Sequence, residues 1–163
     1  MSSLYTILFV CTGNTCRSPM AEGGLKVLLE KERPGKFKVI SAGTGAAAGF
    51  PATMYANEAS KIWGCDLSHH RSQQVTRSLI AGSDLVLAMT QKHAAEIVKL
   101  SPESRDKVYL FKNFPEPSLH GEPVEDPVGQ ALERYNETFL EIGEYLGKAL
   151  PEIIRRIDEK VAA

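Results

Sequence analysis

The residues with the clearest chemical potential lie in one short stretch near the start of the chain. It reads CTGNTCRSP over residues 11–19, so that Cys11 and Arg17 are separated by five residues. Cys11 carries a thiol that becomes a strong nucleophile once it is ionised. Arg17 carries a guanidinium that can bind two oxygens of an oxyanion at once. A nucleophile and an anion-binding group in one loop indicate attack on an oxyanion such as a phosphoryl group.

The flanking sequence places this loop between a strand and a helix. Residues 5–10 are apolar and partly β-branched, which predicts a buried strand. Residues 19–31 carry apolar side chains at helical spacing, and Pro19 suits a first helical position, which makes Ser18 the expected N-cap. Loop N–H groups and a helix N-terminus together cradle a phosphate. The predicted phosphate-binding residues beside Arg17 are Thr12, Gly13, Asn14, Thr15, Cys16 and Ser18.

The same surroundings are expected to ionise the cysteine. A helix N-terminus and a nearby guanidinium lower a cysteine pKa from about 8.5 to within about 3.5–7.5. The Ser18 hydroxyl is placed to donate a hydrogen bond to the sulfur. Gly13 and Asn14 both tolerate the positive φ that a tightly curled loop requires. The sequence therefore predicts a thiolate at Cys11 at the base of an anion site.

The rest of the chain alternates between strand and helix patterns. Further strands are predicted at residues 37–40, 85–89 and 107–111, and further helices at residues 52–63, 92–100 and 130–157. Pro151 is expected to kink or divide the last helix. This pattern predicts an α/β fold in which a four-stranded parallel sheet lies between two layers of helices, as a single domain over residues 1–163. Ligands of such sheets bind beyond the carboxyl ends of the strands.

Composition excludes several classes of function. The chain has 163 residues, with 19 Lys and Arg against 20 Asp and Glu, which argues against nucleic acid or an anionic membrane as the main partner. No apolar stretch approaches the length of a membrane span, and residues 1–5 lack the basic start of a signal peptide. Three cysteines, two of them close together, favour a reducing cytoplasmic location over a disulfide-stapled scaffold.

A second candidate lies in the proline-rich stretch of residues 113–129, which predicts a long loop after the fourth strand. Asp126 in this loop is expected at the same end of the sheet as Cys11. Its carboxyl group could protonate a leaving group, and Asp126-Pro127 could equally begin an ordinary turn. The residues alone leave both interpretations open.

Four segments resemble the low-molecular-weight protein tyrosine phosphatase family. They are VCTGNTCRSPMAE at residues 10–22, ISAGT at residues 40–44, DLVLAM at residues 84–89 and DP at residues 126–127. The resemblance implies a small sheet of four parallel strands flanked by helices, and catalysis without a cofactor or metal. It also implies that Cys11 is the nucleophile, that Arg17 holds the phosphoryl oxygens and that Asp126 is the general acid.

The resemblance extends to residues around the loop. Asn14, Ser41 and His70 match family positions that brace the loop by hydrogen bonds, and such a loop needs support to keep its shape. In the family a cysteine at the place of Cys16 can form a reversible disulfide with the nucleophile, although a small buried residue behind the loop is an equally good interpretation. A metal at His70 and its neighbour is not expected, because no other ligand stands at a suitable spacing.

The resemblance implies phosphorylated proteins as substrates and leaves the phosphorylated residue open between phosphotyrosine and phosphoarginine. Thr15 and the segment Ala88-Met89-Thr90 resemble the bacterial protein arginine phosphatase branch, whereas Val128-Gly129 replaces the aromatic residue that both groups carry after Asp-Pro. A hydroxyl at Thr15 could hydrogen-bond a guanidinium phosphate or its attacking water. The protein is expected to be a monomer.

Two alternatives compete with a phosphatase. Thioredoxin-coupled arsenate reductases share the loop, but they need two further cysteines downstream, and this chain has only Cys65 beyond Cys16. A phosphate-binding module or a redox sensor without turnover would more often lack one catalytic group, and here Cys11, Arg17 and Asp126 fill every role.

Overall fold

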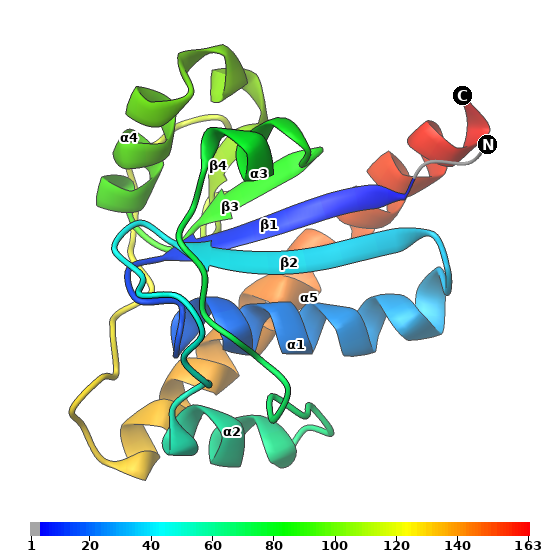
Figure 1. The fold of residues 1–163 in the computed structure, drawn as a ribbon. Helices are drawn as coiled ribbons and strands as arrows, with labels where there is room; N and C mark the ends of the chain where they lie inside the picture. Colours follow the sequence, from blue (N-terminus) through cyan, green and yellow to red (C-terminus); the bar gives the residue numbers. More distant parts are fainter. Residues whose placement is uncertain (1–3) are drawn as a thin grey trace.

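The computed structural model describes residues 4–163, and a parallel β-sheet forms its centre (Figure 1). In this part of the chain the sheet has four strands, which are β1 (Tyr5–Cys11), β2 (Phe37–Gly43), β3 (Leu85–Ala88) and β4 (Val108–Leu110). They lie in the order β2-β1-β3-β4, and every neighbouring pair is parallel. Residues 1–3, which belong to the predicted domain 1–163 and to the stretch tested for a signal peptide, lie outside the described residues.

Helices cover both faces of the sheet (Figure 1). One face packs against α1 (Arg17–Glu32), α2 (Met54–Lys61) and α5 (Leu132–Ala162), and the other carries α3 (Arg77–Ala81) and α4 (Gln91–Leu100). Side chains of β1 alternate between the layers, because Phe9 joins the α1 and α5 core whereas Leu8 joins the core beneath α4. The predicted three-layer α/β fold with a parallel sheet is confirmed.

The strand order determines where a ligand would bind. The chain leaves β1 toward β2 on one side, and it later returns to β3 on the other side of β1. Connections that diverge in this way leave a crevice at the carboxyl ends of the strands. The loops after β1 and β3 therefore lie next to each other at that edge, and the long connection over residues 111–131 joins them there, since Val124 N donates to Met89 O at 2.9 Å.

One expectation about the helices is wrong, and of the kink or division expected at Pro151 the division does not occur. α1 begins at Arg17 with Cys16 as its N-cap, so Ser18 lies inside the first turn and does not cap the helix. The Ser18 hydroxyl instead faces Cys11 and Asn14. α5 runs without division through Pro151, because the lost N–H removes a single backbone hydrogen bond while Ile153 and its neighbours stay buried in the core. The sequence pattern also missed the short α3 and the 3-10 helix over Pro102–Lys107.

The start of β1 and the end of α5 are tied together at the opposite edge of the sheet. Lys160 Nζ donates to the backbone oxygen of Leu4 at 3.0 Å and forms an ion pair with Asp84 at 2.8 Å. The start of β1 and the end of α5 lie side by side in Figure 1.

Candidate active site

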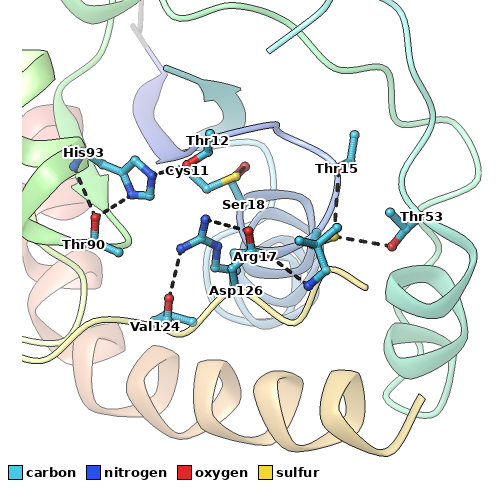
Figure 2. Close-up of polar contacts among 12 residues, drawn as sticks. Cys11, Thr12, Thr15, Arg17, Ser18, Thr53, Thr90, His93, Val124 and Asp126 are labelled. Carbon is cyan, nitrogen blue, oxygen red and sulfur yellow. Dashed lines mark hydrogen bonds and ion pairs between the residues drawn. The ribbon is translucent and has the colours of Figure 1, made fainter. Parts of the chain in front are cut away.

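The loop from Cys11 to Arg17 encloses a small cavity at the carboxyl end of β1 (Figure 2). The cavity has a volume of about 200 Å³ and is lined by residues 11–17 together with Asp126 and Val128. The three predicted catalytic residues therefore face one space, although Asp126 lies more than a hundred residues from the loop. A larger hollow of about 730 Å³ runs along α1 and β2, but neither Cys11, Arg17 nor Asp126 lines it.

Asn14 holds the curled shape of the loop. It is fully buried, and its φ of 58° is the only positive φ of a non-glycine residue among the described residues. Its Nδ2 donates to Ser18 Oγ at 2.8 Å and to Ser41 Oγ at 2.9 Å, and its backbone oxygen lies 2.7 Å from His70 Nε2. Of the two loop residues that tolerate a positive φ, Asn14 makes the bend and Gly13 does not adopt one. These hydrogen bonds offset the cost of the left-handed backbone.

Two further side chains that the sequence did not single out support the same loop. Gln73 donates its backbone N–H to Asn14 Oδ1 at 2.9 Å and its side-chain amide to Ser41 O at 3.0 Å. Ser41 in turn donates its hydroxyl to Glu22 Oε1 at 2.6 Å. Glu22 stands at the end of the family-like segment, but nothing in the sequence indicates that Ser41 is its partner.

The Cys11 thiol is buried, with 2% of the residue exposed, and its sulfur lies 2.9 Å from Ser18 Oγ. Burial raises the pKa of the Cys11 thiol above its ordinary value, because an apolar environment penalises the ionised sulfur. The Ser18 hydroxyl, the Arg17 charge and the backbone N–H groups of Ser18 and Asn14 lower this pKa without overcoming burial. The expected net lowering is therefore wrong.

Arg17 is anchored by the long loop. Its guanidinium is buried, and Nη1 donates to Val124 O at 3.1 Å while Nη2 lies 3.5 Å from Asp126 Oδ2. The Asp126 carboxyl stands at the rim with 41% of its side chain exposed, and its Oδ1 accepts from Val128 N at 3.1 Å. Asp126 thus begins a turn and also lines the cavity, so the expected turn is present and the role of general acid stays a prediction.

Cys16 lies behind the loop among hydroxyl groups. Its sulfur is 3.5 Å from Thr53 Oγ1, 3.6 Å from Tyr135 Oη and 3.9 Å from Thr15 Oγ1. Burial, followed by the neighbouring Cys16, raises the pKa of Tyr135 to about 12. Cys11, Cys16 and Cys65 are all free and buried. A reversible disulfide between Cys11 and Cys16 stays a prediction.

His93 is a polar residue at the cavity edge that sequence reasoning missed. It is 2% exposed, and its Nε2 lies 2.7 Å from Thr12 Oγ1 while its Nδ1 lies 3.0 Å from Thr90 Oγ1 (Figure 2). Burial, followed by the positive charge of Arg17, lowers the pKa of His93 to about 4, so the ring is neutral at pH 7. The sequence feature that could have pointed to His93 is its spacing from Thr90, which stands three residues earlier and just after the third strand.

Two features are absent from residues 4–163. Their His, Cys, Asp and Glu side chains form no group of three or more suited to hold a metal ion. None of the helices in this range has both the length and the apolar character needed to cross a bilayer.

Known proteins that resemble this chain include several phosphatases. The family model described as low molecular weight phosphotyrosine protein phosphatase matches residues 6–163. A protein-arginine-phosphatase of Geobacillus stearothermophilus is 43% identical over 131 residues, which cover 80% of this chain and 84% of the relative. The crystal structure of a low molecular weight protein tyrosine phosphatase from T. tengcongensis superposes with a TM-score of 0.83 at 40% identity, covering 91% of this chain and 99% of that one.

A third likeness concerns the nucleophile. The YwlE arginine phosphatase with its active-site cysteine replaced by a phosphorylated serine superposes with a TM-score of 0.82 at 38% identity, covering 94% of this chain and 95% of that chain. The loop geometry, the matched family model and these relatives lead to one conclusion. The chain belongs to the low molecular weight phosphotyrosine protein phosphatase family.

Proposed function

We propose that the protein is a cysteine-dependent protein phosphatase that hydrolyses phosphotyrosine or phosphoarginine side chains through a phosphocysteine intermediate. The observation that carries this proposal is the convergence of Cys11, Arg17 and Asp126 on one cavity of about 200 Å³. The end of a strand, the start of a helix and a distant loop supply these three groups. Such a cavity accommodates a phosphoryl group, and family membership supports the same reaction.

In the first step the ionised Cys11 sulfur attacks phosphorus, and an S–P bond replaces the bond to the leaving oxygen or nitrogen. The loop N–H groups and the Arg17 guanidinium hold the phosphoryl oxygens and stabilise the charge of the transition state. Asp126 gives its proton to the leaving atom. In the second step the Asp126 carboxylate accepts a proton from water, whose oxygen forms a bond to phosphorus as the S–P bond breaks. Phosphate is released and Cys11 returns to the thiolate. The proposed reaction uses neither metal nor cofactor.

Bracing side chains keep the loop ready for this reaction. Asn14, Ser41 and His70 are proposed to act in this way, because their hydrogen bonds hold the loop without reaching the cavity centre. A site whose donors are fixed before the substrate arrives loses little free energy to reorganisation.

Hydrolysis of p-nitrophenyl phosphate under reducing conditions in the presence of EDTA tests the activity. We expect turnover by the wild-type chain and none by Cys11→Ser, because a serine hydroxyl is a far weaker nucleophile than a thiolate. Absence of turnover by the wild-type chain would contradict the proposal and favour a phosphate-binding module. Turnover that EDTA abolishes would contradict metal-independent chemistry.

The choice between phosphotyrosine and phosphoarginine is proposed to depend on Thr15, which lines the cavity. The relatives named above include phosphatases of both kinds. Replacing Thr15 by Ile removes the hydroxyl and adds apolar bulk. We expect Thr15→Ile to raise the ratio of phosphotyrosine to phosphoarginine peptide hydrolysis, with Thr15→Ser as the control that keeps the hydroxyl. An unchanged ratio would show that Thr15 does not determine the preference between the two substrates.

We further propose that the protein works in the cytoplasm as a monomer built from a single domain of residues 1–163. The catalytic thiol must stay reduced, and a cytoplasmic environment keeps it so. The phosphorylated proteins that are its proposed substrates would then lie in the same compartment as the enzyme. Light scattering after size-exclusion chromatography should give a mass near 17.9 kDa, and a dimer mass would contradict the monomer.

A further inference from the structure

His93 connects two loops that the sheet order brings together. Thr12 follows the catalytic cysteine at the end of β1, and Thr90 follows β3, which is hydrogen-bonded to β1. The His93 ring lies between their hydroxyls and contacts one with each nitrogen, at 2.7 Å and 3.0 Å (Figure 2). Thr12 also lines the catalytic cavity. The row of contacts that runs from Thr90 through His93 to Thr12 therefore ends at the candidate active site.

The hydrogen-bond capacity of each group limits this row to two directions, one for each tautomer of the neutral ring. A neutral imidazole has one N–H donor and one acceptor nitrogen, and a hydroxyl has one donor and two acceptor sites. Thr90 Oγ1 already accepts the His93 backbone N–H at 3.2 Å. Within residues 4–163, the only acceptor in reach of the Thr90 hydroxyl proton is His93 Nδ1. If that proton is donated to Nδ1, Nε2 carries the ring proton and donates it to Thr12 Oγ1. If Nδ1 carries the ring proton instead, Nδ1 donates to Thr90 and the Thr12 hydroxyl donates to Nε2.

A consequence follows for Thr12. With the ring proton on Nε2, the Thr12 oxygen accepts from the ring, so its own hydroxyl proton is free to point toward the cavity that Thr12 lines. With the other tautomer, the Thr12 proton would be used on Nε2 and the cavity would face a lone pair instead. The ring tautomer therefore decides whether Thr12 offers the substrate a donor or an acceptor.

The surrounding charges favour the neutral ring. Arg17 and Lys92 disfavour a second ring proton, Asp126 favours it weakly, and burial disfavours it most. A protonated ring would donate from both nitrogens, and the Thr90 hydroxyl could no longer donate to Nδ1.

We propose that His93 is a positioning residue that holds the Thr12 hydroxyl as a hydrogen-bond donor to the phosphoryl group of the substrate. This proposal rests on the proposed function, because it requires a phosphoryl group in the cavity. Two threonines in the sequence make this arrangement possible. Thr12 directly follows Cys11, and Thr90 stands three residues before His93.

Long-range ¹H–¹⁵N correlation spectra of the histidine rings test the tautomer without any activity measurement. We expect His93 to carry its proton on Nε2 throughout pH 5.5–8, with no titration in that range. Thr90→Val should disturb the His93 ring signals, and Ser104→Ala, a buried hydroxyl elsewhere, should not. A proton on Nδ1, or a titration near pH 6.5, would overturn the proposal.

Kinetics on p-nitrophenyl phosphate test the consequence. We expect Thr12→Val to lower kcat/KM about tenfold, the effect of one lost hydrogen bond to a charged group, while Thr12→Ser restores it. His93→Leu should cause a similar loss, His93→Gln should recover most of it through its side-chain N–H, and Thr12→Val/His93→Leu should lose no more than either single variant.

Two kinetic results would count against His93. A Thr12→Val enzyme with wild-type kinetics would overturn the proposal even if His93→Leu does not fold. So would additive losses in the double variant, since additivity means that the two side chains act independently. Inactivity of the wild-type chain itself would instead refute the proposed function, and the ring spectra would still decide the tautomer.

Discussion

At the scale of single residues, the ionisation of Cys11 depends on a balance between burial and a few polar neighbours. Burial raises the thiol pKa, and the nearest opposing group is the Ser18 hydroxyl at 2.9 Å. Every turnover in the proposed mechanism begins with the thiolate, so each neighbour that favours it contributes to rate.

Ser18→Ala is expected to raise the pKa of Cys11 further. The hydroxyl donates to the ionised sulfur, and such a bond contributes about 1.5–3 kcal/mol, so the thiolate fraction at neutral pH should fall roughly tenfold or more. The rate of iodoacetamide alkylation at Cys11, followed against pH by mass spectrometry, measures this. The buried Ser104→Ala is the matched control, and an unchanged alkylation profile in Ser18→Ala would contradict the assignment.

Asp126→Asn is expected to lower kcat by roughly 10²–10⁴-fold on substrates with a poor leaving group, because the amide has no proton to give. The loss should shrink as the leaving group becomes more acidic, since a phenolate that is stable on its own needs no protonation. A series of substituted phenyl phosphates measures this dependence. An equal loss across the series would mean that Asp126 acts on something other than the leaving atom.

Sequence reasoning located Cys11, Arg17 and Asp126 because two of them lie in one motif and the third lies in a loop at the matching end of the sheet. It missed Gln73 and His93, whose partners are 59 and 81 residues away. It also gave the wrong direction for the pKa of Cys11. The helix terminus and arginine can be read from a motif, whereas the extent of burial is a property of the folded chain.

At the scale of elements, the catalytic loop depends on its close approach to the end of β2. A Cβ added at Gly43 would overlap the backbone oxygen of Thr12, so only glycine lets strand and loop meet there. Thr44 N donates to Cys11 O at 2.9 Å and Gly45 N to Thr12 O at 3.0 Å, which fastens the loop to the segment after β2.

Gly43→Ala is expected to destabilise the fold by about 1–3 kcal/mol, because backbone must move to relieve the overlap, and to reduce activity by displacing the loop. Gly143→Ala in α5 is the matched control. A Cβ there meets nothing, and alanine should raise stability by about 0.5–1 kcal/mol. Urea denaturation measures both changes. A Gly43→Ala chain as stable as the wild type would show that the loop is not held as described.

Most long elements were predicted because their apolar periodicity is strong and continuous. The boundaries were less accurate, and two short elements were missed because five or six residues carry too little periodicity. Ser18 was expected to be a cap on the strength of Pro19, yet α1 starts two residues earlier than that assignment because Arg17 already has helical geometry. Pro151 failed to divide α5 because burial on both sides outweighs one lost hydrogen bond.

At the scale of the whole molecule, the stability of the fold is linked to the neutral state of His93. The ring pKa is about 4 in the folded protein against an ordinary 6.5. The unfolded chain therefore takes up this proton first as the pH falls. The stabilisation is complete above about pH 6.5 and is lost progressively between pH 6.5 and 4.

This linkage predicts a decline of up to about 3 kcal/mol in the free energy of unfolding between pH 6.5 and 4 from His93 alone. His93→Gln should show a shallower decline over the same interval, while His120→Gln, at an exposed position, should keep the wild-type slope. Urea denaturation at several pH values in this range measures the slopes. Parallel slopes for His93→Gln and the wild type would contradict a buried neutral ring.

The contact of Lys160 with Leu4 places both ends of the described chain at the amino-terminal edge of the sheet. The seven residues of β1 then separate this edge from Cys11, a span of roughly 20 Å. A fused reporter or a solid support attached beyond α5 would consequently sit away from the catalytic opening. Immobilised enzyme should retain access to bulky phosphoproteins, which makes the C-terminal end the natural place for an engineered tether.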